Sequence, residues 1–61
     1  MNLSTKDWII NIENTASRVA NEYGQAVVDS VFHRYNAHSL RDLASCYYDE
    51  LFADLEQIAN D

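Results

Sequence analysis

The sequence predicts an all-α protein, a three-helix bundle with a short helical turn between its second and third helices. Three observations lead to this fold class. Apolar side chains recur with the 3.6-residue period of a helix in three separate segments. Proline is absent and glycine occurs once, which favours regular helices. The chain has 61 residues, the size of one small domain, so we expect a single domain over residues 1–61.

The first helix is expected over residues 5–23. Its apolar side chains fall within an arc of about 120° around the helix axis. They are Trp8, Ile9, Ile12, Ala16, Val19, Ala20 and Tyr23. Ser4 or Thr5 can cap the start, and Asp7 lies three residues after Ser4, as in a capping box. Gly24 follows the helix, where a helix end often uses a left-handed residue.

The second helix is expected over residues 25–35, with Asn36 as its C-terminal cap. The apolar side chains of this segment occupy an arc of about 140°. They are Val27, Val28, Val31, Phe32 and Tyr35. Valine favours strands, but these apolar pairs repeat every four residues rather than every two, which indicates a helix.

One short helical turn is expected over residues 40–44. Ser39 is followed three residues later by Asp42, which is a short N-cap signal. Leu40 and Leu43 are three residues apart, so one turn would direct both leucines into the core.

The third helix is expected over residues 46–59, with Ser45 as its N-cap. Its apolar side chains share an arc of about 120°. They are Tyr48, Leu51, Phe52, Leu55, Ile58 and Ala59. The opposite arc carries a set of acids, Asp49, Glu50, Asp54 and Glu56, and no base.

Composition excludes several classes of protein. The chain has ten acidic and four basic residues and a formal charge of −6. No apolar run approaches the roughly 18 residues of a membrane span, so we expect no membrane contact. The first residues lack the order of a signal peptide, and the single cysteine cannot form an internal disulfide, so we expect a cytoplasmic protein.

The second half of the chain combines an aromatic helix end, a turn, two leucines three apart, a tyrosine pair and an acidic helix. The run from Arg34 to Leu43 and the run from Cys46 to Leu55 carry this pattern. It resembles a short helical module at the ends of larger proteins on conjugative transposons, plasmids and phages of Gram-positive gut bacteria. Such modules often have Asn-Pro before the tyrosines, where Ala44-Ser45-Cys46 stands here. The resemblance implies a mobile-element setting and transfers no catalytic residue.

Candidate chemistry is sparse. His33 could pair with Asp29, four residues away, while His38 lies beyond the expected helix end, and zinc needs three or four ligands. Cys46 with a histidine could suggest a thiol nucleophile, but no third group is evident. One glycine cannot build a phosphate loop. We therefore expect no enzyme, no catalytic residue, no metal site and no cofactor.

Direct nucleic-acid binding is disfavoured, because the candidate recognition helix after the turn is acidic and DNA binding requires lysine and arginine. The acids Asp49, Glu50, Asp54 and Glu56 permit another function. Carboxylates on a rigid helix can imitate phosphates and occupy the basic groove of a nucleic-acid-handling protein, as an anti-restriction or anti-CRISPR inhibitor would. The alternative to such mimicry is that these acids form the ordinary solvent-exposed face of an amphipathic helix.

Ile10 breaks the amphipathic pattern of the first helix, because it lies beyond the edge of the apolar arc. Together with Trp8 or Ile9 it marks a candidate partner surface, and Tyr47, at the margin of the third helix's arc, is a further candidate. Ile10 is equally well explained as a lone exposed apolar residue, and Trp8, Tyr23, Tyr35 and Tyr48 as core residues. The leading expectation is a small non-enzymatic protein-protein interaction module. Its partner is another protein or a second copy, because a chain this short gains stability from association.

Overall fold

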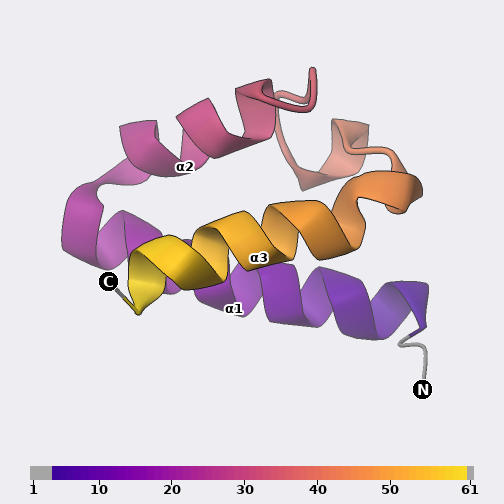
Figure 1. The fold of residues 1–61 in the computed structure, drawn as a ribbon, viewed down its shortest axis with the longest axis horizontal. Coiled ribbons are helices and arrows are strands. Elements are labelled where there is room, and N and C mark those ends of the chain that lie inside the picture. The colour runs from indigo at the N-terminus through magenta and orange to yellow at the C-terminus, as the bar shows by residue number, and fades with distance from the viewer. Residues whose placement is uncertain (1–3, 61) are drawn as a thin grey trace.

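A computed structural model describes residues 4–60 of the chain. These residues form three α-helices, α1 (Thr5–Tyr23), α2 (Gln25–His33) and α3 (Tyr48–Ala59), and no strand. Two short 3₁₀ turns, η1 (Leu40–Asp42) and η2 (Ser45–Tyr47), connect α2 to α3. The helices alternate in direction along the chain, so α1 and α3 run the same way and α2 runs against both (Figure 1). The predicted all-α, three-helix architecture is confirmed.

Helix α1 has the predicted bounds. It begins after Ser4, whose side-chain oxygen accepts a hydrogen bond of 3.2 Å from the backbone N–H of Asp7. It ends at Gly24, whose N–H donates to the carbonyl of Ala20. Gly24 has φ +100° and ψ 155°, a conformation open to glycine almost alone. This residue lets the chain reverse between α1 and α2 without a longer loop.

Helix α2 ends at His33, two residues before its predicted end. Beyond His33 the backbone tightens into 3₁₀-type bonds, in which Arg34 and Tyr35 donate to carbonyls three residues back. Asn36 then takes φ +59°, and the N–H of Ala37 reaches the carbonyl of Phe32 at 3.1 Å. These bonds form a Schellman motif, so Asn36 is the predicted cap although the α-helical part stops earlier.

The connection to α3 differs in detail from the prediction. The expected turn over residues 40–44 is a shorter 3₁₀ turn, η1, which buries Leu43 and packs Leu40 against the core. Ser45 does not cap α3 but opens η2, and α3 begins at Tyr48 rather than at residue 46. Its N-cap position is Tyr47, which makes no side-chain cap bond. The tighter turn places Tyr47 outside the helix.

The core lies between the three helices, with the largest contact between α1 and α3 and with α2 packed against both. The largest fully buried side chains in the described residues are Ile12, Val19, Val31, Leu51 and Leu55. The rings of Trp8 and Phe52 meet edge to face at 5.8 Å and cover the boundary between α1 and α3. Tyr35 and Tyr48 pack against the core as predicted.

Tyr23 does not join the core. It is 49% exposed, although it lies on the predicted apolar arc of α1. The reason is length, because α1 has 19 residues and α3 has 12, and the last turn of α1 reaches past the end of α3 (Figure 1). Thr15, a polar residue outside the predicted arc, is buried instead, so the buried face of α1 is rotated toward Thr15.

Candidate functional site

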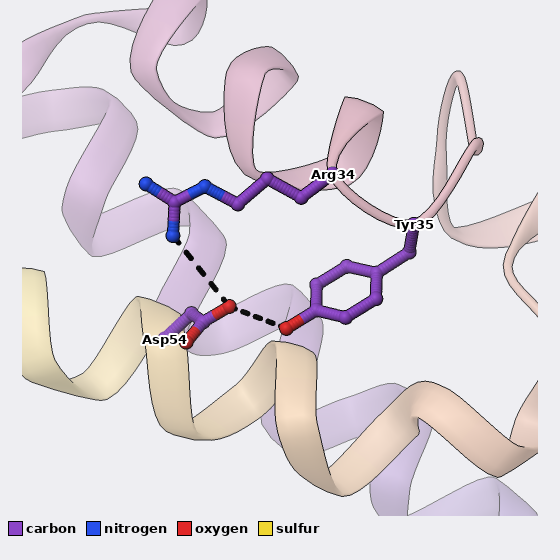
Figure 2. A network of polar contacts seen from close by, with 3 residues as sticks. All are labelled: Arg34, Tyr35 and Asp54. Carbon is purple, nitrogen blue, oxygen red and sulfur yellow. Dashed lines mark hydrogen bonds and ion pairs between the residues drawn. The ribbon is translucent and has the colours of Figure 1, made fainter.

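Three side chains from two distant segments form a polar network at the junction of α2 and α3 (Figure 2). The hydroxyl of Tyr35 donates a hydrogen bond of 2.5 Å to Oδ2 of Asp54. The guanidinium of Arg34 lies 3.8 Å from the same carboxylate oxygen. Figure 2 shows Arg34 and Tyr35 reaching across from the end of α2 toward Asp54 on α3.

The backbone explains why these groups meet. The 3₁₀ bonds after His33 place Arg34 and Tyr35 in the turn just before Asn36. Asp54 lies half-buried on the side of α3 that faces this turn, and its side chain is 28% exposed. The network therefore links residues 19 positions apart and ties α2, whose contact with α3 is the smallest of the helix pairs, to α3.

The hydrogen bond changes the chemistry of Tyr35. Donation to the Asp54 carboxylate, followed by desolvation and by the negative charges of Asp54 and Glu50, raises the pKa of Tyr35 to about 12. Arg34 acts in the opposite direction and lowers this pKa by a smaller amount. Tyr35 therefore stays a neutral hydrogen-bond donor across the physiological range.

Tyr47 completes the surface. Its ring centre lies 5.3 Å from that of Tyr35, with the two planes inclined by 37°. Tyr47 is 39% exposed, and the side chain of Arg34 is 62% exposed. We call Arg34, Tyr35, Tyr47 and Asp54 the tyrosine face. It combines a fixed aromatic pair with an accessible guanidinium.

Hollows of two sizes lie beside the helices. One hollow of about 260 Å³ adjoins the tyrosine face and is lined by Arg34, Asp54, Gln57 and Ile58. It is smaller than the roughly 300–1,000 Å³ of ordinary ligand pockets. A groove of about 500 Å³ runs between α1 and α2, but Val28 and Phe32 on its floor are already buried. The hollow that adjoins the tyrosine face is therefore smaller than an ordinary ligand pocket, which favours contact with a macromolecular surface at that face.

The structure separates the predicted partner residues. Ile10 is 45% exposed, as expected, but Trp8 turns toward Phe52 on α3. Side chains two residues apart on a helix point about 160° away from each other, so Ile10 and Trp8 do not share a patch. Of the three candidates, Tyr47 is the one that is both exposed and paired with another aromatic ring. Sequence reasoning did not foresee the participation of Arg34 and Tyr35.

The four carboxylates of the predicted acidic face lie on two different sides of α3. Asp54 and Glu56 are two positions apart and so point about 160° away from each other on α3. Glu50 lies one turn before Asp54, on the α2 side, whereas Asp49 and Glu56 lie on the other side. Asp54 is already engaged by Tyr35 and Arg34. The four carboxylates therefore do not form one continuous array.

The predicted pairing of His33 with Asp29 is replaced by other contacts. Asp29 accepts a hydrogen bond of 3.2 Å from the side-chain amide of Gln25. The ring of His33 lies 6.0 Å from that of His38, across the Asn36 turn. Within residues 4–60, no three histidine, cysteine, aspartate or glutamate side chains converge as a set that would enclose a metal ion. Cys46 is a free, exposed thiol.

The fold and its surface define a small all-α protein with a preorganised tyrosine face. In the described part of the chain, none of the helices is both long enough and apolar enough to span a bilayer. No protein-family model, no curated protein and no solved structure matches this sequence or fold. The residues of this chain are therefore the basis on which its function is proposed.

Proposed function

We propose that this chain is a small, non-enzymatic protein-protein interaction module that binds its partner through the tyrosine face. The observation that carries the proposal is the exposed ring of Tyr47 packed against Tyr35 at a tilt of 37°, beside an accessible Arg34. Tyrosine and arginine are enriched among the residues that dominate binding energy at protein interfaces. Following the resemblance of its second half, we propose a mobile-element setting and a cytoplasmic location.

The tyrosine face is suited to binding because it is already ordered. Immobilising a flexible side chain on binding costs about 0.5–1.5 kcal/mol. Tyr35 is held by Asp54, and Tyr47 rests on Tyr35, so much of this cost is met when the chain folds. The exposed edge of Tyr47 and the donors of Arg34 remain available to a partner.

The first partner to test is a second copy of the chain. Short chains often gain stability from association, and a two-fold dimer brings the same patch of both copies together. Glu50 lies close enough to the network to act on Tyr35 electrostatically. In such a dimer, Arg34 of one copy can meet Glu50 of the other. We propose no direct contact with nucleic acid, because the chain carries a charge of −6.

The experiment is light scattering on a size-exclusion column, over a range of protein concentrations and at low and high salt. We expect the 7.0 kDa chain to double its mass with rising concentration. High salt should leave the dimer intact, because it screens repulsion between two acidic copies and spares aromatic contacts, while it weakens the pair of Arg34 with Glu50. Tyr47→Ser should abolish the dimer. Tyr23→Ser is the matched control, since Tyr23 is exposed to a similar degree but lies outside the tyrosine face.

Other outcomes separate the alternatives. A constant monomer mass at every concentration would exclude a second copy as the partner. Equal loss of association in both tyrosine variants would contradict the tyrosine face as the contact. An inhibitor that imitates nucleic acid would behave differently with salt, since its binding to a basic groove should weaken steeply as ionic strength rises. Because the α3 carboxylates are divided and Asp54 is engaged, we favour the tyrosine face.

A further inference from the structure

Two histidines that the sequence separates by a helix end lie together in the fold. His33 is the last residue of α2, and His38 follows the Asn36 turn. The Schellman motif reverses the chain there and brings the two ring centres to 6.0 Å, with the planes inclined by 83°. A hollow of about 250 Å³ lies between them and is lined by His33, Asn36, Ala37 and His38. Both imidazoles are exposed to solvent.

A carboxylate orients one of the two rings. Nδ1 of His38 lies 3.2 Å from Oδ2 of Asp42, one of the residues of η1. A carboxylate accepts hydrogen bonds, so Asp42 favours the proton on Nδ1 and leaves the lone pair on Nε2. Histidines that bind metals are held in this way, with a carboxylate on the nitrogen that does not bind.

We propose that His33 and His38 form a surface site for one borderline transition-metal ion, of the Zn²⁺, Ni²⁺ or Cu²⁺ class. A metal bonded at about 2.0–2.1 Å to one nitrogen of each ring, with tetrahedral angles, holds the ring centres about 5 Å apart. The observed ring centres are 6.0 Å apart, about 1 Å more than this, and the side chain of His38 is 86% exposed. Binding therefore requires the two rings to approach each other and to turn one nitrogen each toward the ion. Water fills the remaining positions of the ion.

The ligand set selects the metal. Imidazole nitrogen suits Zn²⁺, Ni²⁺ and Cu²⁺, whereas Mg²⁺ and Ca²⁺ prefer oxygen ligands. Protons compete with the metal for the imidazole lone pairs, so affinity falls in acid. Two protein ligands leave the ion open and exchangeable, unlike a structural zinc site with four.

The test is isothermal titration of the tag-free chain with zinc chloride, and then with nickel and copper salts. We expect one ion per chain, with affinities that rise from Ni²⁺ to Cu²⁺ and fall again at Zn²⁺. An excess of Mg²⁺ or Ca²⁺ should not compete. A stoichiometry of half an ion per chain would mean that two copies share the metal, and it would overturn the single-chain site.

Variants identify the ligands. His33→Ala and His38→Ala should each remove saturable binding, and both should keep the helical circular dichroism, because the two side chains are exposed. Asp42→Asn should weaken binding by roughly 10–100-fold without abolishing it, as loss of an orienting carboxylate does at other metal sites. Glu56→Gln is the matched control, because it removes a charge from α3 at a residue that lines neither of the hollows bordered by His33 or His38. Zinc binding that survives both alanine substitutions would reflect diffuse attraction to the carboxylates and would overturn the proposal.

Discussion

Tyr35 takes part in most of the contacts that form the tyrosine face. It packs against the core, contacts the ring of Tyr47 and donates a hydrogen bond to Asp54 from the end of α2. A single hydroxyl thus links the interior, the exposed aromatic surface and the neighbouring helix. Because the carboxylate of Asp54 stabilises the protonated hydroxyl, the network also has a measurable ionisation.

We predict that one tyrosine ionises at about pH 12 and that this residue is Tyr35. The pKa of Tyr35 is higher in the folded chain than the ordinary value of 10.0. The stabilisation is therefore fully present below pH 10 and is lost as the pH rises toward 12. Phenolate absorbance followed against pH should show this late component. It should disappear in Tyr35→Phe and move to lower pH in Asp54→Asn.

Tyr23→Phe is the control for this titration, since it removes a tyrosine from outside the network. The late component should persist in that variant. Its absence from the wild-type titration, or its persistence in Tyr35→Phe, would show that the bond to Asp54 does not form in solution.

Individual residues show where sequence reasoning succeeds and where it stops. Helical spacing predicted the exposure of Ile10, and residue type predicted the cap at Asn36, because each depends on nearby residues. The same spacing placed Asp54 on a solvated arc. Its engagement with Tyr35, 19 residues away, depends on how α2 and α3 are arranged, which no local pattern contains.

At the scale of elements, helix boundaries set by nearby residues were predictable, whereas those set by the geometry of the connecting turns were not. The bounds of α1 were predictable because Ser4 and Gly24 mark both ends. The start of α3 was not, because Ser45 is a good capping residue in isolation yet belongs to the 3₁₀ turn η2. The pairing of His33 with His38 was also hidden, since it arises from the turn geometry at Asn36.

Helix α3 allows two charge reversals to be compared at positions only two residues apart. We predict that Asp54→Lys destabilises the chain by about 1–3 kcal/mol, because it removes the acceptor of Tyr35 and places a second cation beside Arg34. Glu56→Lys should stabilise it by about 0.3–1 kcal/mol, because the last turn of α3 has no basic residue to complement the helix dipole. Urea unfolding monitored by circular dichroism measures both changes.

The two variants make the same change in net charge, so a general effect of charge would shift both in one direction. Opposite signs would show that position on the helix decides the outcome. Equal stabilisation by both would mean that the −6 charge of the whole chain outweighs the Asp54 network.

At the scale of the whole molecule, the small core limits stability. The described residues span 29 × 23 × 14 Å, and nine hydrophobic residues among them are buried. A chain of fewer than about 70 residues rarely derives more than roughly 3–5 kcal/mol from a single core. The hydrogen bond between α2 and α3 therefore adds a meaningful fraction of the total, and single substitutions in the core should have large effects.

We predict that Leu51→Ala leaves the chain largely unfolded at 25 °C. Leu51 is fully buried in the core, and truncating such a leucine costs about 2–5 kcal/mol, which is comparable with the whole stability of a domain this small. Ile10→Ala, at an exposed position on α1, should change stability by no more than about 0.5 kcal/mol. Thermal circular dichroism at several protein concentrations distinguishes the two. A cooperative transition in Leu51→Ala whose midpoint rises with concentration would mean that association, rather than the core of one chain, supplies most of the stability.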